Sequence, residues 1–501
     1  MKPATLVSRA PAARGLRIRR WMPVRIREFV YHRVVHPFSD RIIKPFNTSL
    51  DNVVSGMKER VFYTDEEGTE RPPCLREWSE LNWAVEDVVG EIGVCNRVSG
   101  AEFIASRSGS KQRAYQHAVR QLADRPSSLS QLSELAFFVK TESTQHLKRQ
   151  VPRIISPRSY GFNYLLGRYT MAVEHKIFDA MSVLFTGRPV VAKGLTQERK
   201  GELIAEKLAK GYVCVGLDAS RFDQTIGRQL LSLEHAVLLG CFPHDRLLPH
   251  LLREQLDNKG KAITNDGMVK AHIGAMRCSG DQNTSLGNCI ISCVLAAAYF
   301  KENGIQDGDI FNDGDDLLMF IKVDQLHILD NLHAWYAQWG LRMKVEEPAF
   351  FPEQVEFCQS KVVWGPQGWM LVRDYRKALN TDYAHNSLVK THDMFLSHIR
   401  SVGLCGLSMA AGIPVLQAYY ELGVRQGKTG KMVCDMGNKR FQGKIQIRAG
   451  HLPRACGISP ETRDSFHLAF GLSPYDQMAM ETMIESWSLA ASPVLLRQDL
   501  Q

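Results

Sequence analysis

Two adjacent carboxylates, Asp315 and Asp316, follow Gly314 in a segment that apolar residues flank on both sides. Residues 289–300 form an apolar, helix-like run before it, and residues 317–321 are apolar after it. This pattern predicts two strands joined by a tight turn, with Gly314 supplying backbone freedom. Neighbouring carboxylates are costly unless a cation neutralises them, and hard divalent cations such as Mg²⁺ take oxygen ligands. A solvated acidic turn is the alternative, so the rest of the chain must decide.

A second pair of carboxylates, Asp218 and Asp223, stands five residues apart. Residues 211–218 are apolar and rich in β-formers, which predicts a strand that ends at Asp218. If the chain turns there, both carboxylates can face one cavity. A helix is expected over 229–239.

Small polar residues gather between 278 and 288, just before the apolar run, and they include Ser279, Gly280, Thr284 and Asn288. This composition predicts a loop that leads into a helix capped by Thr284 or Ser285. Such a loop can bind anions or sugars through amides and hydroxyls. A plain capped helix is the alternative.

A basic segment lies between residues 140 and 158, where Glu142 is the one acid among five cations. Two Pro-Arg steps favour an extended backbone, and arginine forks match phosphate oxygens. The segment therefore predicts phosphate recognition, with a solvated loop as the alternative. Its candidate residues are Lys140, Lys148, Arg153 and Arg158.

The net charge of +9 is concentrated at the start of the chain, because residues 1–60 contain 13 Lys and Arg against 4 Asp and Glu. Such a basic arm can be a mitochondrial-type targeting segment, an RNA-binding arm, a membrane-surface segment or a flexible tail. With 501 residues, several lobes are expected. The 11 scattered cysteines lack a Cys-x-x-Cys motif, which argues against a zinc site or a disulfide framework. The apolar run 289–300 is too short to span a bilayer.

The remaining segments complete the organisation. Residues 76–135 and 375–501 are expected to be mostly helical, and a helix over 323–339 precedes a short strand that carries Lys344. Residues 357–364 predict a further strand and turn. Gly427-Lys428-Thr429 is not a phosphate loop, because Leu422 stands where that motif needs glycine. A late basic cluster comprises Lys428, Lys431, Lys439, Arg440, Lys444 and Arg448.

Taken in order, these motifs closely resemble the palm of viral RNA-dependent RNA polymerases, in particular the tombusvirus-like positive-strand RNA viruses. The stretches that carry the likeness are 151–158, 216–223 and 276–288, and the likeness covers about residues 135–365. It implies an α+β right-hand polymerase fold, with an antiparallel palm sheet and a mostly helical thumb. The expected parts are a basic arm (1–75), fingers (76–210 and 228–270), palm (211–227 and 271–374) and thumb (375–501).

The resemblance also implies roles for the motif residues. Asp218, Asp315 and Asp316 would bind Mg²⁺, with Mn²⁺ as an alternative, for two-metal nucleotidyl transfer. Lys344 would be the general acid for pyrophosphate, although an ordinary surface lysine is an equal alternative. Asp223 and Asn288, with Ser279 or Thr284, would read the ribose 2′-hydroxyl.

Phosphates and partners complete what the resemblance implies. Arg158, with Arg153, Lys140 and Lys148, would hold the triphosphate, and residues 357–360 would position the primer. The expected partners are NTPs, the RNA template and the RNA product. Other viral replication proteins, and host membranes contacted through the basic arm, are further expected partners. The expected location is a membrane-associated replication complex in the host cytoplasm.

Two other functions compete with this one. A reverse transcriptase would use dNTPs, but Asp223, Asn288 and the Gly-Asp-Asp hairpin favour NTPs. A non-catalytic RNA-binding scaffold would suit the basic arm, yet a scaffold has no need of the motif carboxylates.

Overall fold

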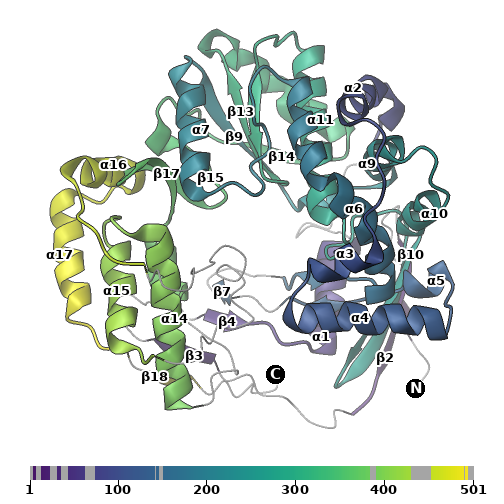
Figure 1. Cartoon of the computed structure of the whole chain (residues 1–501), viewed down its shortest axis with the longest axis horizontal. Helices are drawn as coiled ribbons and strands as arrows, with labels where there is room; N and C mark the ends of the chain where they lie inside the picture. Colours follow the sequence, from purple (N-terminus) through teal and green to yellow (C-terminus); the bar gives the residue numbers. More distant parts are fainter. Residues whose placement is uncertain are drawn as a thin grey trace.

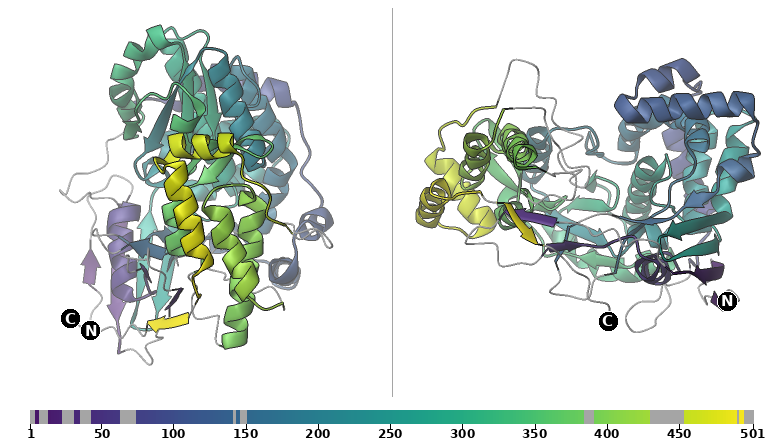
Figure 2. Two further views of the ribbon diagram at one scale, coloured as in Figure 1. Left: turned by 90° about the vertical axis from the view of Figure 1, so that its left-hand side faces the viewer. Right: turned by 90° about the horizontal axis from the view of Figure 1, so that it is seen from below.

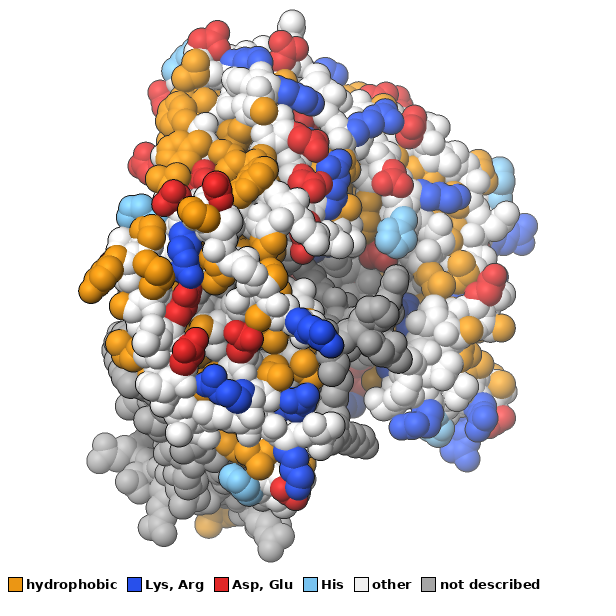
Figure 3. Space-filling view, turned by 60° about the vertical axis from the view of Figure 1, so that its left-hand side comes forward, with side chains coloured by type: hydrophobic (Ala, Val, Ile, Leu, Met, Phe, Trp, Pro, Cys, Tyr) orange, Lys and Arg blue, Asp and Glu red, His pale blue; other side chains and the backbone are white. Residues whose placement is uncertain are grey.

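A computed structural model describes most of the chain. For residues 4–6, 13–15, 31–34, 43–45, 143–145 and 491–494 it describes the backbone only. The described residues are 4–6, 13–22, 31–34, 43–62, 74–140, 143–145, 151–383, 391–429, 453–489 and 491–494. Helices and antiparallel sheets alternate along them, which confirms the expected α+β class. Figure 1 shows the C-terminal helices, in green and yellow, on the left and the helices of residues 82–180 on the right, and the space-filling view in Figure 3 is hollowed between two lobes.

A four-stranded sheet lies at the centre of the motif residues. Its order is β12 (Asp309–Asn312), β13 (Asp316–Ile321), β9 (Val213–Ala219) and β14 (Met343–Val345), and all neighbours are antiparallel. The predicted hairpin around Gly314 is confirmed as β12 and β13. Both faces of the sheet are apolar: Leu317 and Met319 join one core, while Leu318 and Phe320 join another. Burial on both faces fixes the register, since a slip by one residue would exchange the two sets.

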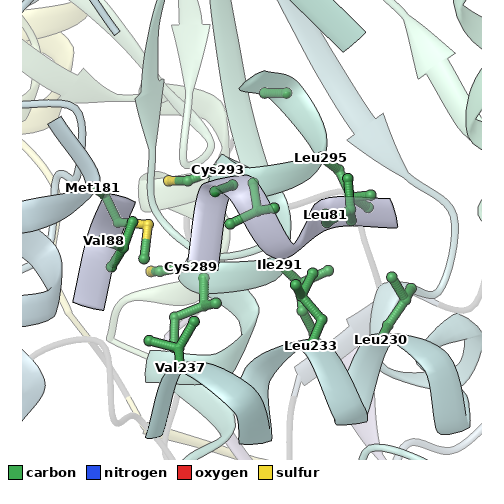
Figure 4. Packing of buried hydrophobic residues seen from close by; sticks show 14 of the residues in the cluster. Leu81, Val88, Met181, Leu230, Leu233, Val237, Cys289, Ile291, Cys293 and Leu295 are labelled. Atoms are coloured by element: carbon green, nitrogen blue, oxygen red, sulfur yellow. The ribbon is translucent and has the colours of Figure 1, made fainter. Parts of the chain in front are cut away.

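Helix α11 (Thr284–Glu302) fills the core on the first face. Figure 4 shows its Cys289, Ile291 and Leu295 among side chains of the helices that surround it. The other labelled side chains belong to α2 (Asn82–Ile92), α9 (Arg228–Cys241) and two 3₁₀ segments, Trp78–Leu81 and Met181–Leu184. Helix α6 (Tyr160–Ala180) also packs on α11. Helix α11 is longer than the apolar run of residues 289–300, and by length and composition it is able to cross a membrane. However, 83% of its apolar 18-residue window is buried inside the protein.

The N-terminal cap of α11 differs from the sequence prediction. Asn283, and not Thr284 or Ser285, occupies the N-cap position, and its side chain makes no capping hydrogen bond. The Asn283 amide instead donates to Glu234, so a buried tertiary partner has displaced the local cap.

The second face of the central sheet packs on α7 (Gln197–Ala209) and on a three-stranded antiparallel sheet. The strands of that sheet are β15 (Glu356–Phe357), β16 (Ser360–Gly365) and β17 (Gly368–Arg373). Gly201 of α7 lies against the backbone of Met370, where a Cβ would come within 2.4 Å of the Met370 Cα. Helix and strand can therefore approach closely only because residue 201 is glycine.

A five-stranded sheet contains part of the basic N-terminal segment. Its order is β1 (Ala4–Leu6), β2 (Ala13–Arg20), β11 (Gly267–Ile273), β10 (Asn258–Thr264) and β5 (Leu135–Ala136). One face packs on α1 (Leu50–Gly56) and on the single π-helical segment that follows it, Met57–Phe62. Residues 13–20 and 50–62 are thus built into this sheet and its core, rather than forming a free arm.

The basic segment around residue 150 is extended at both ends, as predicted. β6 (Phe138–Val139) pairs with β8 (Ile154–Ile155), and the amide of Lys140 donates to the Arg153 carbonyl at 2.8 Å. Nearby, β4 (Ile43–Pro45) pairs with β7 (Ser143–Gln145). Lys148 lies outside the described residues.

The C-terminal part is mostly helical, as expected, and has its own core. Its helices are α13 (Tyr375–Thr381), α14 (His392–Ala410), α15 (Leu416–Gln426), α16 (Pro460–Phe470) and α17 (Pro474–Glu485). A last strand, β18 (Ala491–Val494), pairs with β3 (Tyr31–Val34). Lys428 is described, but the other members of the late basic cluster lie outside the described residues.

Short helices connect these parts. They are α3 (Gly100–Ala105), α4 (Gly109–Asp124), α5 (Leu129–Leu132), α8 (Phe222–Thr225), α10 (Leu248–Arg253) and α12 (Leu332–Gln338). Within the described ranges, 3₁₀ segments occur at Trp78–Leu81, Met181–Leu184, Glu254–Leu256, Val323–Asn331 and Pro352–Gln354. The single helix expected over 323–339 is therefore a 3₁₀ segment followed by α12.

Candidate active site

Asp316, Asp218 and Lys344 form a row across three strands of the central sheet. Asp218 on β9 lies between the other two: its register partner on β13 is Asp316, and its register partner on β14 is Lys344. Side chains of directly opposed residues project from the same face, with Cβ atoms about 5 Å apart. The sheet therefore brings together two carboxylates and one ammonium group that lie up to 126 positions apart in sequence. All three residues are exposed to solvent.

The turn that carries Asp315 is held by hydrogen bonds from two sides. The Asn312 side chain accepts from the Gly314 amide at 3.0 Å and donates to the carbonyls of Gly314 and Asp316 at 2.9 and 3.1 Å. Ser292 of α11 donates to the Gly314 carbonyl at 2.6 Å. Gly314 has φ +94°, a conformation that other residues rarely adopt. The turn is thus fixed to both the sheet and the core helix.

Asp313 adds a buried ion-pair network that the sequence analysis missed. Its carboxylate binds the Nζ atoms of Lys193 and Lys200, the latter at 2.6 Å, and the Lys200 side chain is only 3% exposed. Burial alone would raise the pKa of Asp313, but the two ammonium groups hold it below its usual value. An acid beside the Gly-Asp-Asp segment was visible in the sequence; its partners, more than 100 residues away, were not.

The two carboxylates after Gly314 are electrostatically strained. Loss of hydration raises the pKa of Asp315, and the Asp223 carboxylate adds to this, while Lys193 and Arg153 oppose it. The same loss of hydration, with the charges of Asp315, Asp313 and Asp218, raises the pKa of Asp316 to about 6. A nearby cation would relieve this repulsion.

The donor set fits a hard divalent metal. Asp218, Asp315 and Asp316 offer only oxygen atoms, which Mg²⁺ and Mn²⁺ prefer. Among the described residues, no three Asp, Glu, His or Cys side chains converge closely enough to enclose an ion by themselves.

Asp223 is the centre of a hydrogen-bonded triad. Asn288 of α11 donates to its Oδ1 at 2.9 Å, and the Ser279 hydroxyl donates to its Oδ2. The Thr284 hydroxyl is engaged elsewhere, since it donates to the Cys278 carbonyl at 3.1 Å. The structure therefore brings Asp223, Ser279 and Asn288 together, and Thr284 supports their loop.

Gly280 joins this loop to the basic segment. It has φ +119°, and a Cβ there would lie 3.1 Å from the backbone nitrogen of Pro157. The amide of Ser156 donates to the Ser279 carbonyl at 2.7 Å. The two motifs thus lie side by side.

A buried polar network supports the triad from behind. Arg277 is 2% exposed; its Nε donates to the Asn288 Oδ1 at 3.0 Å, and its Nη2 pairs with Glu234. Asn283 donates to the other oxygen of Glu234 and accepts from Gln255 at 2.8 Å. This network has no local sequence signature, because Glu234 has the pattern of a polar position on an amphipathic helix.

Arg158 lies in the same network and not at the surface. Its side chain is 1% exposed, and its guanidinium binds both oxygens of Asp281, at 2.7 and 3.3 Å. Further bonds go to the Ser133 carbonyl and to Asn258. These contacts occupy the donors that the sequence analysis assigned to a triphosphate. By contrast, Arg153 is exposed, and its charge lowers the pKa of Asp315.

Residues 357–360 form a two-residue hairpin turn beside the carboxylates. Cys358 and Gln359 have φ of 52° and 60°, as a type I′ turn requires. The Cys358 side chain hydrogen-bonds to Asp316, and Lys377 donates to Gln359. Together with Asp218 and Asp316, this turn lines a cavity of about 200 Å³.

Comparison with known proteins decides the family. The model of the family described as viral RNA-dependent RNA polymerase matches residues 19–492, which is nearly the whole chain. The chain belongs to this family. The central sheet, with its carboxylate row and its Gly-Asp-Asp turn, is therefore that of a viral polymerase family member.

The relatives of this polymerase family member confirm the resemblance to the tombusvirus-like group. The RNA-directed RNA polymerase of Tobacco necrosis virus (strain A) is 33% identical over 473 residues, covering 90% of this chain and 63% of that protein. That of Oat chlorotic stunt virus is 31% identical over 518 residues, with 98% and 68% covered. That of Tomato bushy stunt virus (strain Cherry) is 33% identical over 454 residues, with 88% and 54% covered. The chain thus spans about half to two thirds of its relatives' length.

Proposed function

We propose that this chain is an RNA-directed RNA polymerase that adds NTPs to an RNA 3′ end on an RNA template and releases pyrophosphate. The observation that carries this proposal is the row of Asp316, Asp218 and Lys344 beside the Asp223–Ser279–Asn288 triad. The two groups are neighbours, because the Asp223 carboxylate raises the pKa of Asp315 and a Cβ on Gly314 would lie 3.8 Å from the Asn288 Cβ. Family membership and the names of the relatives support the same activity.

In the proposed reaction the primer 3′-hydroxyl oxygen bonds to the α-phosphorus of the NTP. The bond from that phosphorus to the oxygen that bridges it to the β-phosphorus breaks, and pyrophosphate leaves. Divalent ions, Mg²⁺ or alternatively Mn²⁺, supply charge stabilisation at the attacking and leaving oxygens. Asp218 and Asp315 are positioned to hold them, and Asp316 is an auxiliary ligand.

Lys344 is proposed to donate a proton to the leaving pyrophosphate. It is exposed and stands directly opposite Asp218, so the ammonium group can reach the phosphates of a nucleotide bound there. A positioned general acid contributes typically 10²- to 10⁴-fold to rate.

Sugar recognition is assigned to the triad. Asp223 accepts from both Ser279 and Asn288, and a ribose 2′-hydroxyl would add a donor and an acceptor to this set. A deoxyribose would leave the polar groups without that partner, which is how a site built for a hydroxyl rejects its analogue.

Phosphate binding is assigned to Arg153, with Lys140 beside it and Lys148 as an untested third member. Arg158 is given a positioning role instead, because its guanidinium holds Asp281 below the Ser279–Gly280 loop. The turn at 357–360 is proposed to position the primer strand.

The right-hand architecture follows from these roles. We assign the central sheet with α11 to the palm, the five-stranded sheet and its neighbouring helices to the fingers, and α13 to α17 to the thumb. The late basic cluster would line an RNA channel. The predicted boundaries are kept, except that β2 and α1 belong with the fingers.

Membrane association through the basic segment and contact with other viral replication proteins in the host cytoplasm remain proposals, as does mitochondrial targeting. Deleting residues 1–60 would remove β2 and α1 from a folded core, so charge substitutions are the better test. Unchanged fractionation of a variant that lacks Arg9, Arg14, Arg25 and Arg27 would contradict this localisation.

Incorporation of NTPs compared with dNTPs on one RNA template tests the activity. Strong preference for NTPs is expected, whereas preference for dNTPs would indicate a reverse transcriptase. RNA binding without any incorporation would favour the scaffold.

A further inference from the structure

The exposed face of the five-stranded sheet is unusually basic. Along β2, Leu16 and Ile18 point into the core, while Arg17 and Arg19 point to solvent. The same alternation on β10 and β11 buries Ala262, Val269 and Ala271. The opposite face carries Lys259, Lys261 and Ile263 from β10, and Met268, Lys270 and His272 from β11. Figure 2 shows this sheet at the end of the molecule where the N-terminus lies, away from α14 to α17.

Three cations stand directly opposite one another on this face. The register pairs Arg17 with Lys270, and Lys270 with Lys261. Like charges directly opposed across strands destabilise a sheet. Glu134 binds Lys261 at 3.0 Å, but Arg17, Arg19 and Lys270 form no ion pair with any residue that the structure describes. Arg17, Lys270 and the neighbouring Arg19 therefore have no acidic partner among the described residues, whereas Lys261 has Glu134.

The neighbouring rows show that compensation is available elsewhere on the sheet. Asp257 accepts from His272 at 2.7 Å and lies 3.5 Å from Lys259. Arg20, which points to the other face, binds Asp51 of α1 at 2.6 Å. Figure 3 likewise shows acids and bases interspersed on another face of the molecule. Among the described residues, the cations of this face that lack an acidic partner are thus Arg17, Arg19 and Lys270.

Exposed apolar side chains border the charged row at one end. Arg19 pairs with Met268, which pairs with Ile263, and Ile263 is 66% exposed. Trp21 follows on the same side of β2; its Nε1 donates to the Asn265 carbonyl at 2.9 Å, and 39% of the residue is exposed. A fixed indole ring beside arginines resembles the stacking platforms on which unpaired bases lie.

We propose that this sheet face, defined by Arg17, Arg19, Trp21, Lys261 and Lys270, is a second RNA-binding surface that holds single-stranded RNA outside the active site. The cations lie about 4.8 Å apart across the strands and about 7 Å apart along β2, so they can follow a phosphodiester backbone. The identity of the polyanion as RNA rests on the proposed function. A lipid surface fits less well, because the exposed apolar groups stand only at the Arg19 end of the row, while the rest of the face is charged.

The test measures binding of a fluorescent single-stranded RNA to the full chain over a range of salt. The variant is Arg17→Ala/Arg19→Ala/Lys270→Ala. The matched control is Arg113→Ala/Arg120→Ala/Arg125→Ala, which removes three exposed cations from α4 and its end. The sheet variant should bind several-fold more weakly, and the slope of log Kd against log salt should fall by about 2, since each cation contributes about 0.7 on single strands. The control should keep the wild-type slope.

Three further measurements make the outcomes distinct. The sheet variant should extend a short primer–template as fast as the wild type does. If neither protein extends the primer, the proposed function is contradicted, but the comparison of RNA affinities still tests the binding surface. The conservative variant Arg17→Lys/Arg19→Lys/Lys270→Arg should retain affinity, which separates lost charge from misfolding. In the wild type, RNA should slow acetylation of Lys270 but not of the exposed Lys301.

Two results would overturn the proposal. One is equal RNA affinity and slope in the sheet and control variants. The other is a sheet variant that binds RNA as tightly as the wild type but no longer binds vesicles made of equal parts phosphatidylserine and phosphatidylcholine. That result would mean that this face binds a lipid surface.

Discussion

Asp218 and Asp316 are register partners on adjacent antiparallel strands, β9 and β13. Backbone hydrogen bonds set their separation, so the two carboxylates are brought together before any substrate or ion binds. Because both faces of the sheet are packed, a shift of either strand would bury charge and expose leucine. Lost hydration is the main reason that the pKa of Asp316 is raised to about 6; the charge of Asp315 adds to it, and those of Asp313 and of the facing Asp218 add less.

The Asp313 network is expected to stabilise the turn that carries Asp315. Asp313→Asn should lower the free energy of unfolding by about 3–5 kcal/mol, because it leaves the buried Lys200 without its partner. Adding Lys200→Met should recover part of that loss. Denaturant melts measure both effects. The control Arg199→Met, which removes exposed ion pairs on the same helix, should change stability by less than about 1 kcal/mol; an equal effect would contradict the role of Asp313.

Arg277 is expected to influence sugar selection through Asn288. Arg277→Lys keeps the charge beside Glu234 but removes the Nε donor to Asn288. The ratio of kcat/KM for NTP to that for dNTP should fall about 10-fold, the equivalent of one hydrogen bond of about 1.4 kcal/mol. Steady-state incorporation assays measure this ratio. Asn288→Ala should lower this ratio further. An unchanged ratio in both variants would mean that the Asp223–Ser279–Asn288 triad does not recognise the ribose.

Arg153 and Arg158 should behave in opposite ways. Arg153→Ala should raise the apparent KM for NTP about 10-fold and leave the melting temperature unchanged, since the side chain is exposed. Arg158→Ala should lower stability by about 3–5 kcal/mol, because Asp281 would lose its buried partner, with the KM of the folded fraction unchanged. Paired kinetics and thermal melts decide this. The reverse pattern would restore Arg158 as the phosphate ligand.

Lys344 is expected to act in the chemical step. Lys344→Met should lower kcat by about 10²-fold or more, with little change in KM for NTP, whereas Lys301→Met, a distant exposed lysine, should have no effect. Rapid-quench single-turnover extension isolates this step. Equal rates for Lys344→Met and the wild type would mean that Lys344 is an ordinary surface residue.

Local pattern was enough to predict the strand–turn–strand around Gly314, the core helix after Asn283 and the strand before Asp218. Apolar periodicity and turn residues determine such elements within a few positions. The resemblance implied an antiparallel palm sheet but not which strands pair in it, since the pairing of β9 with β13 and β14 depends on contacts more than 90 residues apart.

The misassigned residues share one physical cause. The Pro-Arg repeat does not say which arginine faces inward; burial against Asp281, 123 positions away, decides it. Asn283 likewise gives its side chain to Glu234 instead of capping α11. Lys200, Arg277 and Glu234 carry no local signature, because their function lies in partners from distant segments. Residues that the chemistry requires at a fixed local spacing can be predicted from the sequence. Residues whose role depends on a partner from a distant segment cannot be predicted in this way.

Primer extension on a single-stranded RNA template with Mg²⁺ and NTPs tests the central claim most directly, with the wild type beside Asp315→Ala. Extension by the wild type alone is predicted, because Asp315 is a proposed ligand for the ions that stabilise the reacting oxygens. Equal extension by both proteins would contradict the assignment of the carboxylate row as the catalytic centre.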